Sequence, residues 1–545
     1  MNDIKQQTLQ LIDDLKATCK TYGLGNDGNE YKIITQVFLY KFLNDKFAYE
    51  IKKLKTPLAE PLRQAEHWEL AYEKMQDKDR LKLLVHLSAD SLRLEPQHLI
   101  KNLWNNQNKG DFDVIFDSTM MDIAQKNIDI FSTHTTEDTK IPLFEPLTNY
   151  VTDSAKRCDF ARALVGRLVK FSFENAFEQH YDFFAVVFEY LIKDYNTDSG
   201  GKYAEYYTPH AIAVIMARLL VGDDPNLHSI ECYDPSAGTG TLLMALAHQI
   251  GEDRCTIFAQ DISQRSNKLL KLNLILNNLS HSLDKAVQGD TLTDPYFRTD
   301  DGNMLRTFDY IVSNPPFKMD FSDTRNTIAS YSSRFWAGVP NVPAKKKDQM
   351  AIYTCFIQHL INSLKANGKG AIVVPTGFIT SKTGIESKIL KKIVEDKIVY
   401  GCISMPPNVF ATTRTNVSVL FFDNSRKNDK VVLIDASKLG EEYKEGNNQK
   451  RRLTQEEIEQ IVSTFREKKV VDDFSVCVSY DEIIQKGYSL SAGQYFAIRI
   501  EYEDITQEEF EQKISEYKMS LSSLFEQSNQ LGKEVLKSFN KLEFE

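Results

Sequence analysis

The sequence predicts an α/β protein with a mainly parallel sheet, a helical N-terminal domain and a helical tail at the C-terminus. Apolar residues recur every three or four positions up to about residue 165, as in amphipathic helices. Short β-rich runs then alternate with helical stretches up to about residue 425. The last forty residues follow a heptad pattern. We therefore expect three domains, at 1–165, 166–500 and 501–545.

The N-terminal region is predicted to hold helices over 4–20, 32–54 and 61–94. Strands are expected at 229–233, 255–260, 310–313, 371–374 and 417–422, with a further one at 431–434. Strands separated by helices form βαβ units, in which the sheet is covered on both faces. Ligands of such sheets bind at the carboxyl ends of the strands.

Composition bounds the possible functions. The 545 residues are 42% hydrophobic and 26% charged, as in water-soluble proteins. No run of eighteen apolar residues occurs, so we expect no membrane span and a cytoplasmic location. Seven scattered cysteines form no C-x-x-C or Cys/His cluster, which predicts reduced thiols and no metal site. The net charge of −10 implies that any DNA-binding surface is local, or that a partner supplies it.

A glycine-rich turn follows the strand predicted at 229–233. Gly238 and Gly240 allow a ligand to approach the backbone closely, and a helix is expected to begin near Thr241. The spacing differs from G-x-G-x-x-G, and Asp234 ends the strand. A carboxylate there favours a ligand with an ammonium group over a pyrophosphate. A tight turn that binds nothing is the alternative.

Two further acidic residues follow predicted strands. Asp261 lies about twenty residues after Gly240, where an acidic side chain reaches ribose hydroxyls in nucleotide-binding folds. A helix N-cap is the alternative for this residue. Asp290 is a candidate acceptor for an adenine amino group, with an ordinary surface turn as its alternative. Upstream, Thr208 is expected to cap a helix that has Pro209 at its first position.

The strongest motif is Asn314-Pro315-Pro316-Phe317, which directly follows an apolar strand. Two prolines fix the backbone and leave a rigid turn rich in hydrogen-bond acceptors. The Asn314 side-chain carbonyl and the Pro315 backbone carbonyl can accept both N–H groups of an exocyclic amine, which would localise its lone pair. Phe317 can stack on the ring. The motif therefore predicts transfer of a methyl group to such an amine by positioning and electrostatics.

Together these segments resemble the gamma-order amino methyltransferases, and more closely the modification subunits of type I restriction-modification systems. Glu205 to Pro209, the Asp234 to Gly240 loop and the Asn314 to Phe317 turn match family motifs. Further matches are Gly368 to Pro375, the Pro-x-x-x-Phe segment between Met405 and Phe422, and the region from Tyr488 to Tyr495. His210 stands where the family often has arginine, and Asp261 where it often has glutamate.

The resemblance implies a Rossmann-like S-adenosylmethionine-dependent fold that methylates N6 of a flipped adenine in double-stranded DNA. It implies that the catalytic residues are Asn314, Pro315, Pro316 and Phe317, with no metal. The cofactor-binding residues that it implies are Tyr207, Thr208, Pro209, Asp234, Ser236, Gly238, Gly240, Thr241, Asp261 and Asp290. The implied partners are one specificity subunit for two modification subunits, and a restriction subunit in the full complex.

The C-terminal tail carries the heptad pattern. Its seam residues are Phe510, Ile514, Tyr517, Leu521, Leu524, Leu531 and Val535, with Ser528 in one polar position. Nearly four heptads require a partner helix, either on another subunit or within this chain. The resemblance favours the specificity subunit.

Other functions stay open from the residues alone. A solitary or type II adenine methyltransferase would carry its own recognition region. A protein-glutamine methyltransferase also uses Asn-Pro-Pro-aromatic, although the long N-terminal domain and Phe317 disfavour it. Methylation of cytosine at N4 also stays open, because N4 is an exocyclic amine like N6 of adenine. A non-catalytic scaffold is disfavoured because Asp234, Asn314 and Phe317 are intact.

Overall fold

The protein is described by a computed structural model. It covers residues 2–25, 29–89, 91–137, 139–177, 187, 190, 208–302, 304–410, 416–445, 448–496 and 506–539. Met1–Tyr495 form one compact unit and Phe496–Glu545 form a second, smaller one. None of the described helices has both the length and the apolar character that crossing a membrane requires.

The N-terminal region is predominantly helical, as predicted. Its helices are α1 (Asn2–Thr21), α2 (Glu30–Lys53), α3 (Glu60–Gln64), α4 (Trp68–Lys74), α5 (Asp77–Val85), α6 (Ile100–Asn105), α7 (Phe112–Lys126) and α8 (Arg157–Leu168). The helical stretch predicted at 61–94 is divided into three short helices. The break between α4 and α5 is stabilised by Arg80 of α5. Its guanidinium donates to the carbonyls of Tyr72 and Met75 at the end of α4, at 3.4 and 3.1 Å.

Most strands from residue 230 onward, together with β1 (Thr133–Thr135) and β2 (Lys140–Ile141), form a large, mostly parallel sheet in the order β13-β10-β8-β9-β7-β6-β3-β4-β5-β1-β2. Its strands are β3 (Ile230–Asp234), β4 (Cys255–Asp261), β5 (Ala286–Gln288), β6 (Phe308–Ser313), β7 (Leu364–Pro375), β8 (Val399–Ser404), β9 (Val417–Asp423), β10 (Lys430–Asp435) and β13 (Ser475–Ser479). Strands β9, β13 and β2 run antiparallel to their neighbours. Each of the six strands predicted from sequence overlaps an observed one.

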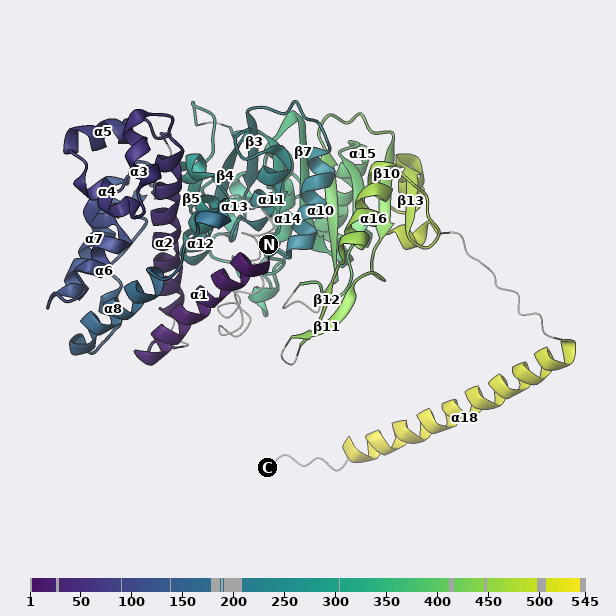
Figure 1. Cartoon of the computed structure of the whole chain (residues 1–545). Helices are drawn as coiled ribbons and strands as arrows, with labels where there is room; N and C mark the ends of the chain where they lie inside the picture. Colours follow the sequence, from purple (N-terminus) through teal and green to yellow (C-terminus); the bar gives the residue numbers. More distant parts are fainter. Residues whose placement is uncertain are drawn as a thin grey trace. The chain divides into compact units, whose positions relative to one another are not determined.

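Every residue of β9, an interior strand of the sheet, is buried. This burial indicates that both faces of the sheet are covered, as helices cover them in α/β folds. One group of helices that pack together is α10 (His210–Val221), α11 (Thr241–Ile250), α12 (Gln264–Leu276) and α16 (Gln455–Arg466). Another group is α14 (Tyr353–Asn362), α15 (Gly384–Glu395) and α17 (Tyr480–Gln485). The hairpin of β11 (Glu441–Glu445) and β12 (Asn448–Arg452) projects from this body (Figure 1).

The N-terminal region contributes to the sheet itself. Strand β1 (Thr133–Thr135) pairs with β5 in parallel, and β2 (Lys140–Ile141) pairs with β1. The buried amine of Lys271 in α12 donates to the carbonyl of Ile141 at 2.9 Å, and burial lowers the pKa of this lysine to about 7. Figure 1 shows the purple N-terminal helices beside the β5 end of the sheet. The helical region and the sheet are therefore one packed unit.

The smaller unit holds α18 (Gln507–Phe539), a single helix of 33 residues. The seam residues predicted from the heptad pattern all lie within this helix. Every one of them is exposed, with side-chain exposures between 37 and 63%. A long helix with an exposed apolar seam fits the expectation of a partner helix.

Candidate functional site

The glycine-rich loop and the Asn-Pro-Pro-Phe turn leave neighbouring strands at the same edge of the sheet. Strand β3 lies between β4 and β6 and runs parallel to both. The loop follows β3, Asp261 ends β4, and Asn314 follows β6 directly. Parallel strands direct their carboxyl ends to one edge, so the sheet order brings these predicted residues together.

The glycine loop adopts the conformation that its glycines permit. Gly238 and Gly240 have positive φ angles of 53° and 81°, and α11 begins at Thr241 as predicted. A Cβ atom on Gly240 would lie 2.4 Å from the Cδ1 atom of Leu270, so a side chain does not fit there. At Gly240 the loop therefore packs closely against Leu270, a residue of α12.

Asp234 is a buried carboxylate that has no cation beside it among the described residues. Its side chain is 1% exposed, and its Oδ1 atom accepts the backbone N–H of Ser236 at 2.9 Å. Burial raises the pKa of Asp234 to about 8. A carboxylate in such surroundings favours a ligand that brings a positive charge.

Asp261 ends β4, and Asp290 lies two residues after the end of β5. The Asp261 carboxylate accepts the N–H groups of Gly238 and Ser263, both at 2.8 Å, and so connects β4 to the glycine loop. Burial raises the pKa of Asp261. Asp290 follows β5 and accepts the N–H of Leu292 at 2.9 Å. The two acids thus lie at the same sheet edge as Asp234.

One side-chain contact joins the glycine loop to the end of β6, and a second joins the Asn-Pro-Pro-Phe turn to Thr208. The hydroxyl oxygens of Ser236 and Ser313 are 2.6 Å apart, and Ser313 is the last residue of β6. The Asn314 amide nitrogen donates to the Thr208 hydroxyl at 3.0 Å. A small pocket between them is lined by Thr208, Asp234, Ser236, Ala237, Thr239, Thr241, Leu242 and Asn314. Five of the predicted site residues therefore line one pocket.

Thr208 does not have the capping role predicted for it. Helix α10 begins at His210 with Pro209 before it, one residue later than expected. The Thr208 hydroxyl instead accepts a hydrogen bond from Asn314. Tyr207 lies outside the described residues.

The aromatic residue of the turn has an aromatic neighbour. The Phe317 ring lies edge-on to Tyr353 of α14, with 6.3 Å between the ring centroids. Tyr353 in turn packs edge-on against Phe378, at 5.9 Å. Phe317 is half-buried, so part of its surface is available to a further ring.

The structure adds residues that the sequence does not mark as functional. The sequence predicts Ser313 only as part of a strand. Arg334 is buried and donates to the carbonyls of Thr291 and Leu292, next to Asp290, and burial lowers its pKa to about 10. It therefore stabilises the turn that carries Asp290. No local pattern marks Arg334, because its acceptors are backbone carbonyls more than forty residues away.

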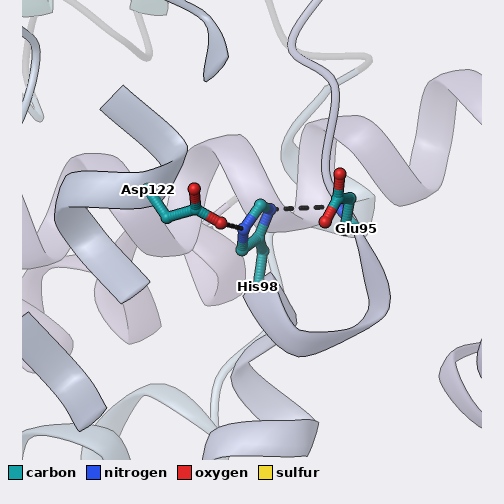
Figure 2. Close-up of side chains that lie close together, drawn as sticks. All are labelled: Glu95, His98 and Asp122. Carbon is teal, nitrogen blue, oxygen red and sulfur yellow. Dashed lines mark hydrogen bonds and ion pairs between the residues drawn. The ribbon is translucent and has the colours of Figure 1, made fainter. Parts of the chain in front are cut away.

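A separate polar cluster lies in the N-terminal region, where Figure 2 shows Glu95, His98 and Asp122 together. The Nδ1 atom of His98 accepts the Glu95 backbone N–H at 3.0 Å, so Nε2 carries the proton and donates to Asp122 at 2.7 Å. The Lys126 amine lies 2.6 Å from Glu95 and 3.1 Å from Asp122. Because this lysine already balances both carboxylates, we interpret the cluster as structural.

Comparisons with known proteins agree on one family. A family model described as N-6 DNA Methylase matches residues 179–507, more than half of the chain. The type I restriction enzyme MpnII methylase subunit of Mycoplasma pneumoniae is 24% identical, over 92% of this chain and 91% of that protein. The MjaIX methylase subunit of Methanocaldococcus jannaschii is 29% identical, over 67% of this chain and 64% of that protein.

A solved structure shows the same fold. The type I restriction-modification methyltransferase subunit from Streptococcus thermophilus superposes with a TM-score of 0.70. The superposition covers 90% of this chain and 99% of the other, at 21% sequence identity. The predicted mixed α/β architecture, with a helical N-terminal region and a long C-terminal helix, is therefore confirmed.

The buried carboxylate generates a prediction for stability. The folded protein holds the Asp234 proton more tightly than the unfolded chain, whose pKa is near 3.8, so unfolding free energy falls as pH rises from about 4 to about 8. Asparagine keeps an acceptor for Ser236 and has no proton to lose. Asp234→Asn should therefore gain stability over wild type, by up to about 1.4 kcal/mol per pH unit across this range. Urea unfolding of both proteins at several pH values measures the difference. A difference that stays constant with pH would contradict the raised pKa.

Proposed function

The chain belongs to the N-6 DNA methylase family, and we propose that it is the modification subunit of a type I restriction-modification system, which methylates N6 of adenine in DNA. The observation that carries this proposal is the contact between Ser236 and Ser313, which joins the glycine loop to the Asn-Pro-Pro-Phe turn. The match to nearly the full length of a type I methylase subunit favours this function over a solitary enzyme with its own recognition domain.

S-adenosylmethionine is the proposed cofactor, and the residues of the loop fit it. The buried Asp234, without a cation of its own among the described residues, suits the ammonium group of a methionine moiety. Asp261 and Asp290 are proposed to accept hydrogen bonds from the ribose hydroxyls and from the adenine amino group. Ser236, Gly238, Gly240 and Thr241 would surround the methionine part, together with Tyr207, Thr208 and Pro209. The cofactor supplies an electrophilic methyl group on a sulfonium.

The Asn-Pro-Pro-Phe turn is proposed to prepare the amine of the target adenine. The Asn314 amide nitrogen donates to Thr208, so its carbonyl oxygen is the atom left to accept from the amine. The Pro315 carbonyl is the second acceptor, and together the two would direct the nitrogen lone pair toward the methyl group. Pro316 keeps the turn rigid, and Phe317 would stack on the flipped base.

The helix α18 and the domain boundaries belong to the same proposal. We assign 1–165 to a helical N-terminal domain, 166–500 to the catalytic domain and 501–545 to a partner-binding helix. The exposed seam of α18 supports docking on a helical specificity subunit, in a complex of two modification subunits and one specificity subunit. A restriction subunit would join this complex for cleavage.

The proposed function is tested by Asn314→Ala. Loss of one acceptor that acts mainly in the transition state should lower methyl transfer by a factor of about 100 to 1,000, while the affinity for S-adenosylmethionine stays unchanged. The assay follows labelled methyl groups into adenine of duplex DNA, with the specificity subunit present. Asn226→Ala, on an exposed loop, is the matched control. Transfer at the wild-type rate by Asn314→Ala would remove this residue from the mechanism.

Thr208 is expected to act by positioning the Asn314 amide. Thr208→Val keeps the shape but removes the acceptor, so kcat should fall about tenfold, the worth of one neutral hydrogen bond, with little change in cofactor affinity. Thr208→Ser retains the hydroxyl and should recover most of the rate. Steady-state kinetics and cofactor titration separate the two effects. Loss of cofactor binding in proportion to kcat would show that Thr208 acts through the cofactor alone and would contradict its positioning role.

The seam of α18 is expected to hold the partner. Removing residues 506–545, or introducing Leu521→Asp with Leu524→Asp, should weaken assembly with the specificity subunit on a sizing column and leave cofactor binding intact. Ser522→Asp with Ser523→Asp adds the same charge away from the seam and is the control. Unchanged assembly of the seam variant would refute the assignment.

A further inference from the structure

Three consecutive lysines lie in the segment that follows the Asn-Pro-Pro-Phe turn. Lys345, Lys346 and Lys347 are exposed, and none of them forms an ion pair with a described residue. Lys318, just after the turn, is exposed as well. The acids between residues 318 and 348 are Asp320, Asp323 and Asp348, against six lysines and arginines. Hydrogen bonds from Ser322 and, after them, the charge of Lys347 lower the pKa of Asp320, so this acid is near Lys347. An unbalanced group of cations stands out in a chain whose net charge is −10.

Backbone and side-chain contacts fix these lysines beside the turn. The N–H of Met319, two residues after Phe317, donates to the carbonyl of Met350 at 3.1 Å. The Lys318 amine donates to the side chain of Gln349 at 2.8 Å. Residues 345–350 therefore lie next to the residues that leave the proposed base-binding turn.

The other end of the lysine segment is held equally firmly. The Arg325 guanidinium donates to the carbonyls of Val339 and Pro340, at 3.1 and 3.2 Å. Gln358 of α14 donates to the carbonyl of Gly338 at 3.0 Å. A charged run usually lies on a solvated face without a partner. This one is different because it is anchored at both ends and placed beside the turn.

Resting on the proposed function, we propose that Lys345, Lys346 and Lys347 bind phosphates of the DNA backbone beside the flipped adenine. An acidic protein that acts on DNA requires a local basic surface, since backbone contacts depend on cations that neutralise phosphates. Phosphate contacts position a duplex without reading its sequence. Cations fixed near the turn would hold the backbone of the nucleotide that is turned out of the helix.

The test is the salt dependence of DNA binding. The full chain, assembled with its specificity subunit, is titrated into a fluorescent duplex of random sequence at several salt concentrations. The slope of log affinity against log salt becomes shallower by about 0.9 for each phosphate that the protein no longer neutralises. The triple variant Lys345→Gln, Lys346→Gln, Lys347→Gln should therefore reduce the slope by up to about 2.7, with S-adenosylmethionine affinity unchanged.

A matched control removes the same charge elsewhere. Arg426, Lys427 and Lys430 are exposed and follow β9, which runs antiparallel to β7. They therefore lie at the sheet edge opposite the Asn-Pro-Pro-Phe turn. Changing all three to glutamine should leave the slope at the wild-type value.

The outcomes separate the two claims. A shallower slope for the Lys345–Lys347 variant alone supports the phosphate contact. A slope equal to wild type, or an equal change in the control, overturns it. If the wild-type complex binds the duplex but methylates no adenine in any DNA offered, the proposed function fails, and the slopes still decide whether these lysines bind DNA.

Discussion

The adjacency of β3 and β6 is the constraint on which the site depends. These strands are distant in sequence, yet they pair in parallel, so the loop after one and the turn after the other emerge side by side. The hydroxyl contact between Ser236 and Ser313 connects the glycine loop to the end of β6. A group bound against the glycine loop and an amine held by Asn314 would then share one small space. Methyl transfer needs little more than this proximity and the correct orientation.

Buried polar groups maintain this arrangement at a cost to stability. Asp234 is buried without a cation among the described residues, and Arg334 is buried with backbone carbonyls as its hydrogen-bond acceptors. Uncompensated burial of charge is unfavourable, so it occurs where function requires it. Asp261 receives two backbone N–H groups and orders the glycine loop before any ligand binds. Arg334 orders the neighbouring turn. The pocket is thus prepared by the protein, and a cationic ligand would favour the ionised form of Asp234, whose pKa burial raises to about 8.

The sequence was sufficient for the architecture and for the motifs, because periodicity and the Asn-Pro-Pro-Phe turn are local signals. It was insufficient where long-range contacts decide. The sequence does not predict strand β8, because Gly401 interrupts its apolar, β-branched pattern. That glycine makes room for the Phe465 ring, since a Cβ on Gly401 would lie 2.1 Å from it. Strand β5 has only three residues, and β1 comes from a region whose periodicity is helical. The hydrogen bond from Asn314 to Thr208 spans 106 residues, so no spacing predicts it.

The central claim is that a cofactor held by the glycine loop and an adenine held by Asn314 occupy one continuous site. The most direct measurement is the affinity of a linked analogue, in which N6 of an adenine is joined to an S-adenosylmethionine analogue at the position of the transferred methyl group. Calorimetry on the full chain should find binding at least about tenfold tighter than for the same analogue without the adenine, since the second group binds at a high effective concentration. Equal affinity of the two compounds would contradict the account.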